Sequence, residues 1–148
     1  MTTLATVAWI DTTLSHHAIP YWIFGGFAVD LHVGEMTRAH GDVDVAVREV
    51  DFARAAELLA GAGWTRTSNA DQGYATFDRM GETVDLAPVA LDDPSWPAGA
   101  FGEDVGELAG VRAHVITREA LVADKQVRRD DPTTRAKDAA DVRRLAPV

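Results

Sequence analysis

The amino-acid sequence predicts an α+β fold in which a small mixed β-sheet is flanked by helices. Three observations support this prediction. The length of 148 residues is typical of one domain, so we expect a single domain over residues 1–148. A hydrophobic content of 47% is enough to bury an ordinary core. Segments with helical and strand-like spacing of apolar residues follow one another without an internal repeat, and the last two are helical.

The first half of the chain contains two helices and two strands by these signals. Apolar residues at helical spacing predict an opening helix, and short apolar runs predict strands that a glycine pair and a polar loop interrupt. The predicted elements are a helix over 2–18, a strand over 21–24, one or two helical turns over 27–33, a loop over 34–41 and a strand over 43–47.

In the second half, Asp51 is a candidate N-cap for a helix that Gly61 and Gly63 end. Thr117 is the corresponding candidate cap for a helix that extends to about Arg129. The other predicted elements are strands over 64–68, 73–78 and 82–89, a loop over 91–104, a hairpin over 106–116 and a helix over 133–145 that follows a break at 131–132.

Composition excludes several classes of protein. The chain has no cysteine, which rules out disulfides, thiol catalysis and zinc–thiolate sites. No apolar run approaches the roughly 18 residues of a membrane span, and the N-terminal residues lack the basic start of a signal peptide, so we expect a cytoplasmic protein. The net charge of -9 argues against a long nucleic acid as partner and favours a small or cationic acceptor. The alternative is that the acidic surface only keeps the protein soluble.

Asp42 and Asp44 are the main candidates for metal ligands. Residues i and i+2 of a strand point to the same face, so these two carboxylates stand side by side in a run otherwise made of Val and Ala. Two like charges this close repel unless a cation lies between them. Mg²⁺ takes one or two carboxylates and completes its octahedron with phosphates and water. The pair indicates a metal-dependent phosphate site, although Asp-x-Asp alone is also common in solvated strands and turns.

Gly25 and Gly26 strengthen that interpretation. They lie between a predicted strand and a predicted helix start, an arrangement that presents backbone N–H groups and a positive helix terminus to an anion. Glycine suits the position because a phosphate must approach the backbone closely. Most glycine pairs are only turns, so the evidence lies in the order and spacing of the pair relative to Asp42 and Asp44.

Asp85 is the third candidate carboxylate of the site. It stands within the apolar strand segment 83–87, where an unpartnered carboxylate carries a heavy desolvation cost. A structural Asp satisfied at a strand end is the alternative. Glu82 and Asp78 have less apolar surroundings, and we expect both to be exposed.

These motifs together resemble the nucleotidyltransferase superfamily, and within it the small-molecule branch that contains the lincosamide and aminoglycoside nucleotidyltransferases. The resemblance covers about residues 21–145. It implies a polymerase-beta-like core. Two departures are Phe27, where the family often has Trp, and an end at Val148, where larger members continue into a helical domain. The motifs that carry the resemblance are the Gly-Gly segment 25–30, the segment 37–44, Val84-Asp85 and the helix 135–145.

The resemblance implies roles for these residues. Asp42 and Asp44 would hold Mg²⁺ on a nucleoside triphosphate, ATP in our expectation, and a second metal about 3.5–4 Å away would complete a two-metal site. Asp85 would ligate the second metal or act as general base on the acceptor hydroxyl. Gly25 and Gly26 would cradle the β- and γ-phosphates.

Basic residues near these motifs are candidates for phosphate contacts. Arg38 and His40 would steady the triphosphate. A loop salt bridge for Arg38 and a solvated ring for His40 are the alternatives. Lys125 is a further candidate, against the alternative of a solvated charge beside Arg128 and Arg129. We expect Lys137 and Asp138 to lie on the surface of a helix.

Aromatic and acidic residues of the 91–104 loop are candidates for the acceptor site. Trp96 is a candidate lining residue of an acceptor or base pocket, whereas we expect Trp9, Trp22 and Trp64 to lie in the core. The loop acids would form an acidic rim for a cationic sugar, or are plain solvated acids; they are Asp92, Asp93, Glu103 and Asp104.

The function that follows is Mg²⁺-dependent transfer of a nucleoside monophosphate, AMP in our expectation, to a hydroxyl of a small acceptor such as an aminoglycoside or lincosamide, with release of pyrophosphate. One alternative is a nucleotidyltransferase of a toxin–antitoxin or defence system that acts on a macromolecule. Another is a non-catalytic nucleotide-binding relic, against which the three intact carboxylates argue. We expect a homodimer whose second subunit helps to wall the acceptor site, and no contact with a membrane.

Overall fold

The computed structural model describes residues 1–68, 73–126 and 132–145, and it has the predicted α+β architecture. A five-stranded sheet has the strand order β1-β2-β5-β4-β3, and a two-stranded sheet pairs β6 with β7. The strands are β1 (Tyr21–Phe24), β2 (Val43–Arg48), β3 (Thr65–Arg66), β4 (Ala75–Arg79), β5 (Glu82–Val89), β6 (Val105–Leu108) and β7 (Val111–His114).

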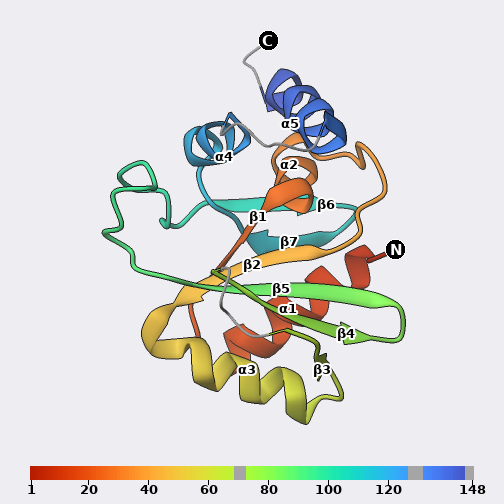
Figure 1. The fold of residues 1–148 in the computed structure, drawn as a ribbon, viewed down its shortest axis with the longest axis vertical. Coiled ribbons are helices and arrows are strands. Elements are labelled where there is room, and N and C mark those ends of the chain that lie inside the picture. Colours follow the sequence, from red (N-terminus) through yellow and green to blue (C-terminus); the bar gives the residue numbers. More distant parts are fainter. Residues whose placement is uncertain (69–72, 127–131, 146–148) are drawn as a thin grey trace.

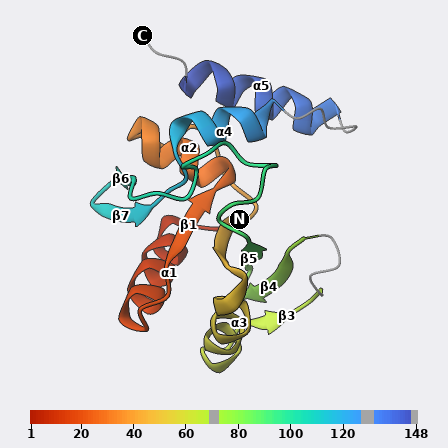
Figure 2. The ribbon, with the colours of Figure 1, turned by 90° about the vertical axis from the view of Figure 1, so that its left-hand side faces the viewer.

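The helices divide between the two ends of the molecule (Figures 1 and 2). One group gathers α4 and α5 against α2, and α3 lies at the opposite end, packed on β2 and β5. The first helix packs on β7. The helices are α1 (Leu4–His16), α2 (Gly25–Val33), α3 (Phe52–Gly61), α4 (Arg118–Lys125) and α5 (Pro132–Leu145), and a 3-10 turn, η1 (Glu49–Asp51), precedes α3.

Strand β2 lies between β1 and β5, and this position organises the site. It pairs antiparallel with β1 and parallel with β5, which makes the sheet mixed as predicted. The parallel register sets Asp44 opposite Asp85. Side chains at paired positions of neighbouring strands lie on the same face of a sheet, so the register brings two carboxylates together from distant parts of the sequence.

The core lies on both faces of this sheet. Valines 43, 45 and 47 of β2 are fully buried, as are Val84 and Leu86 of β5. Trp22 and Trp64 are buried as expected, and Trp9 packs on the core with partial exposure. A central strand covered on both faces has a nearly continuous apolar sequence. A buried aspartate within it is costly unless a partner compensates its charge.

Two predicted helix starts differ from the structure. Helix α2 begins at Gly25 rather than Phe27, so the glycine pair forms its first turn. Asp51 is not a side-chain cap of α3; its carboxylate instead accepts a hydrogen bond of 2.7 Å from Nε of Arg48. The 3-10 turn places Asp51 in a helical backbone conformation, whereas a capping side chain requires an extended one.

The predicted hairpin turn and the N-cap of α4 are confirmed, whereas α1 and β3 are shorter than predicted. The Ala109-Gly110 hairpin forms, with Ala109 at a φ of 49° and Gly110 at 83°. Thr117 caps α4 by accepting the backbone N–H of Ala120 at 3.2 Å. The structure describes α4 as far as Lys125, and the predicted extension to Arg129 and break at Asp131 lie outside the described residues. Within the described part of the chain, the helices are too short or too polar to cross a bilayer.

Candidate active site

Three carboxylates meet where β2 begins beside β5. Asp42 directly precedes β2, Asp44 is its second residue, and Asp85 lies opposite Asp44 on β5. One oxygen from each carboxylate lies within 4.8 Å of the other two. Oxygen ligands at this spacing are the donor set that Mg²⁺ or Mn²⁺ prefers. The structure therefore brings together the three predicted carboxylates, and their chemistry fits a divalent cation.

The electrostatics of this cluster favour a bound cation. Burial raises the pKa of Asp44 well above its ordinary value, and the negative charges of Asp42 and Asp85 raise it further. Burial also raises the pKa of Asp85 to about 6, although a 2.7 Å hydrogen bond from Oγ1 of Thr76 opposes the shift. Carboxylates that resist ionisation because of one another are stabilised by a metal ion, whose charge reverses the local preference.

The glycine pair is packed against the same cluster. Gly25 has a φ of 71°, in the left-handed region that L side chains rarely adopt. A Cβ at Gly25 would collide with Oδ2 of Asp44, and a Cβ at Gly26 would collide with the imidazole of His40. Both positions therefore need glycine, for conformation and space at Gly25 and for space at Gly26. The first turn of α2 lies next to the carboxylates, as a shared metal–phosphate site requires.

The two predicted phosphate-binding cations share one partner. Arg38 makes a bidentate ion pair with Asp141 of α5, with Nη2 3.1 Å from Oδ2. Lys125 of α4 lies 3.1 Å from Oδ2 of Asp141 and 3.3 Å from Oδ1 of Asp138. The Lys125 side chain is only 9% exposed, so the interpretation as a solvated charge is wrong.

His40 is also buried rather than solvated. Its Nε2 donates to Oδ2 of Asp30 at 2.6 Å, and both side chains are excluded from water. Asp30 in turn accepts the backbone N–H of Thr37 at 3.1 Å and its hydroxyl at 2.5 Å. This network joins α2 to the loop that carries Arg38 and Asp42, so it holds that loop and the glycine turn in one rigid unit.

Sequence reasoning missed the buried acids of α5. Asp141 is fully buried and Asp138 is buried, whereas we expected Asp138 on the surface. Lys137 is exposed as expected. Asp138 and Asp141 are three positions apart, which places both on one face of a helix. That spacing was the available signal, but the face becomes internal only because α5 packs on α2 and α4.

Glu82 also has a structural role that its context did not reveal. Its Oε1 accepts three hydrogen bonds at the start of α1, from the N–H and hydroxyl of Thr3 and from the hydroxyl of Thr6, at 2.6–2.8 Å. The carboxylate thus satisfies donors at a helix N-terminus, where negative charge is stabilising. Glu82 belongs to the scaffold of β5 rather than to the carboxylate cluster.

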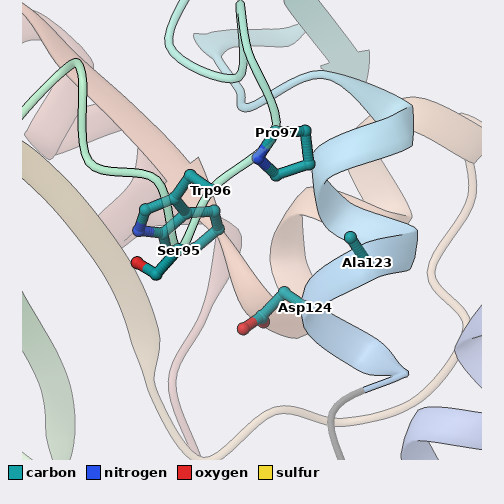
Figure 3. A pocket seen from close by; sticks show the side chains of 5 residues that line it. All are labelled: Ser95, Trp96, Pro97, Ala123 and Asp124. Carbon is teal, nitrogen blue, oxygen red and sulfur yellow. The ribbon is translucent and has the colours of Figure 1, made fainter.

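A pocket of about 220 Å³ opens beside this site (Figure 3). Trp96 lines it and packs edge-on against Phe24 and Phe101. Helix α4 forms another wall with Ala123 and Asp124. The negative charge of Asp124 contributes to the raised pKa of Asp44, so the pocket lies close to the carboxylates. Ser95 and Pro97 complete the described lining.

The raised pKa of Asp85 predicts how stability depends on pH when metal is absent. The folded-state pKa of about 6 exceeds the ordinary value of 3.8, so between these values the folded protein keeps a proton that the unfolded chain has lost. Stability from this group is present at low pH and declines as the pH rises through that window. Asp85→Asn removes the group, so in EDTA the melting temperature of the variant, relative to that of wild type, should increase between about pH 4 and about pH 6 and stay level above that range. A constant gap between the two proteins would contradict the assigned environment.

A family model now relates this geometry to known proteins. The model described as aminoglycoside-2''-adenylyltransferase matches residues 6–128, which include the glycine pair and all three carboxylates. The chain belongs to the aminoglycoside-2''-adenylyltransferase family. A curated relative, the 2''-aminoglycoside nucleotidyltransferase of Klebsiella pneumoniae, is 29% identical over 115 residues. The match covers 72% of this chain and 63% of that protein, so the chain aligns with somewhat less than two thirds of its relative.

Solved structures confirm that the fold is that of a nucleotidyltransferase. ANT(2'')-Ia in complex with adenylyl-2''-tobramycin superposes with a TM-score of 0.76 at 23% identity, over 96% of this chain and 85% of that one. The lincomycin-bound lincosamide antibiotic adenylyltransferase LnuA superposes with a TM-score of 0.76 at 18% identity, over 97% and 96%. The family membership and the shared fold confirm the resemblance predicted from the motifs.

Proposed function

We propose that this chain is a magnesium-dependent adenylyltransferase that moves AMP from ATP to a hydroxyl of an aminoglycoside. In this reaction the acceptor oxygen bonds to the α-phosphorus, the bond from that phosphorus to the bridging oxygen breaks, and pyrophosphate leaves with the displaced electron pair. The observation that carries the proposal is the cluster of Asp42, Asp44 and Asp85 beside the glycine turn, in a chain of the aminoglycoside-2''-adenylyltransferase family.

Each group of residues in the site has a separate role in the proposed reaction. Asp42 and Asp44 would hold Mg²⁺, with Asp85 as the remaining carboxylate of the set. The bound metal would neutralise charge on the triphosphate and on the leaving pyrophosphate. Backbone N–H groups of the Gly25–Gly26 turn are positioned to bind phosphate oxygens. Arg38 and Lys125 border this region and supply positive charge to the triphosphate.

Asp85 is the proposed general base. A base is most effective when its pKa lies near the operating pH, and burial raises the pKa of Asp85 to about 6. The bond from Thr76 holds one carboxylate oxygen, which fixes the orientation of the group. His40 is the other candidate base near the carboxylates, but its Nε2 is bound to Asp30 and its ring is buried against Phe27. Asp85 is therefore better placed to take the proton of an incoming hydroxyl.

An aminoglycoside is the acceptor class that the charges favour. These compounds are polycations, and the chain carries a net charge of -9. The pocket beside the carboxylates has an aromatic wall at Trp96 and an acidic one at Asp124, which suits an amino sugar. We place the acceptor there. The fold shared with LnuA makes a lincosamide the competing acceptor.

One assay tests the proposal. The protein is incubated with MgATP and, separately, with a panel of aminoglycosides and with lincomycin, and products are identified by mass spectrometry. We expect an adenylylated aminoglycoside and equimolar pyrophosphate, with Asp42→Asn as the inactive control. Adenylylated lincomycin alone would reassign the acceptor. No transfer to any member of the panel, with ATP bound, would favour a macromolecular acceptor or a non-catalytic relic.

The homodimer expected from the sequence stays a prediction. Sedimentation velocity at micromolar concentration, with and without MgATP, would check it. A monomer with full transfer activity would refute the idea that a second subunit walls the acceptor site.

A further inference from the structure

Asp141 of α5 holds both cations of the site at once. It is fully buried, accepts two hydrogen bonds from the guanidinium of Arg38 and lies 3.1 Å from Nζ of Lys125. Burial alone would raise the pKa of Asp141, but the hydrogen bond from Arg38 and the charge of Lys125 outweigh it and lower the pKa. The carboxylate is therefore ionised, and it is oriented by two partners from different segments of the chain.

The two cations border the site on different sides. Arg38 lies against the glycine turn, since its Nη2 is 3.3 Å from the position that a Cβ of Gly26 would occupy. Lys125 lies near the carboxylates, since its positive charge opposes the rise in the pKa of Asp44. The buried carboxylate of Asp141 contacts both groups. It therefore fixes the distance between the Arg38 guanidinium at the glycine turn and the Lys125 ammonium near the carboxylate cluster.

Without Asp141, Lys125 retains Asp138, whose Oδ1 lies 3.3 Å from its Nζ, and the three carboxylates of the site compete with Asp138 for the ammonium. Three carboxylates with no metal between them attract any nearby ammonium, because their negative charges lie within a few ångströms of one another. The flexible four-carbon stem of Lys125 permits such a move. An ammonium placed among Asp42, Asp44 and Asp85 would occupy the position where the same oxygens would hold a metal.

We propose that Asp141 is a positioning residue for nucleotide binding: it aims Arg38 and Lys125 at the triphosphate and keeps Lys125 off the metal-binding carboxylates. The inference rests on the proposed function, because it assumes that a metal-bound triphosphate occupies this site. Asp141 itself does not touch the nucleotide. Its effect is confined to ligands that carry the β- and γ-phosphates, and to the metal concentration that their binding requires.

Calorimetric titration of Asp141→Asn with MgATP and with AMP tests the inference. We expect MgATP affinity to fall about 10- to 100-fold, the equivalent of one or two charge-assisted hydrogen bonds, while AMP affinity changes little. The Mg²⁺ concentration needed for half-maximal ATP binding should rise. In a cycle with Arg38→Gln, the effect of Asp141→Asn should shrink, because part of it acts through Arg38.

Leu145→Ala is the matched control for a purely structural role of α5. Leu145 is buried on the same helix and its apolar side chain can form no ion pair with either cation, so its truncation should lower the melting temperature and leave the ratio of ATP to AMP affinity unchanged. If Asp141→Asn does not fold, Asp141→Glu keeps the charge, displaces it by one methylene and should show the same selective loss, reduced in size.

The outcomes separate the two proposals. Wild-type protein that binds no MgATP refutes the proposed function and this inference with it. Wild-type protein that binds MgATP, combined with an Asp141 variant of unchanged or increased MgATP affinity, refutes the inference alone. An equal selective loss in Leu145→Ala would also overturn it, because the effect would then belong to helix docking.

Discussion

Asp44→Asn should abolish nucleotidyl transfer and at the same time raise the melting temperature of the metal-free protein. The variant removes a proposed metal ligand, and a bound metal would supply several kcal/mol of transition-state stabilisation, so we expect a loss of about 10³-fold or more. The gain in stability follows from the raised pKa of Asp44, which burial and the charges of Asp42 and Asp85 cause. An uncharged amide removes that repulsion. Single-turnover kinetics and thermal melts in EDTA measure the two effects.

Asp51→Asn is the control for the same change at a buried aspartate outside the site. Asp51 is ion-paired with Arg48 at 2.7 Å, so loss of its charge should lower stability and leave transfer intact. The two variants are therefore expected to move the melting temperature in opposite directions. Retained turnover in Asp44→Asn would remove Asp44 from the metal site, and a lowered melting temperature would contradict the repulsion argued for the cluster.

Gly25→Ala should also eliminate activity, through backbone and contact effects together. The residue has a φ of 71°, which costs a non-glycine residue roughly 1–2 kcal/mol. The added methyl group would also collide with Oδ2 of Asp44. To relieve the collision, either the carboxylate leaves its place in the cluster or the first turn of α2 shifts. Both changes separate the phosphate-binding turn from the metal ligands. Unfolding free energy, MgATP affinity and transfer rate report the result.

Gly34→Ala separates strain from collision. Gly34 has a similar φ of 84°, and the nearest atom to an added Cβ is the carbonyl oxygen of Glu107 at 4.0 Å. Gly34→Ala should lose about as much stability through backbone strain as Gly25→Ala does. Its MgATP affinity and its transfer rate should stay unchanged. If both variants lose affinity equally, backbone strain is sufficient and the contact between Gly25 and Asp44 carries no special role.

Much of the site was predictable because its signals are local. Strand geometry alone places Asp42 and Asp44 on one face. The glycine pair is recognisable from its position between a predicted strand and a predicted helix start. Asp85 was recognisable as a charged residue within an apolar strand. In the structure that strand, β5, pairs with β2 and sets Asp85 opposite Asp44. The helix and strand order was predictable for the same reason, since apolar periodicity is a property of short windows.

The supporting residues were not predictable in that way. From the sequence, a solvated ring was one alternative for His40. In the structure its loop packs against α2, and the ring is buried and hydrogen-bonded to Asp30. Asp138 was expected on the surface of its helix and is buried because α5 packs on α2 and α4, and the same packing buries Asp141, for which the sequence analysis gave no role. The N-cap prediction for Asp51 was wrong because an intervening 3-10 turn changed its backbone conformation.

The sequence by itself determined the fold class, the order of the elements and the identity of the three clustered carboxylates and of the glycine turn beside them. The tertiary structure decided which charges face one another. Arg38, Lys125 and Asp141 come from three separate segments, and their contact depends on how α4 and α5 dock. Periodicity and motif spacing act over a few residues, whereas burial of a charge is settled by chain segments that meet only in the folded molecule.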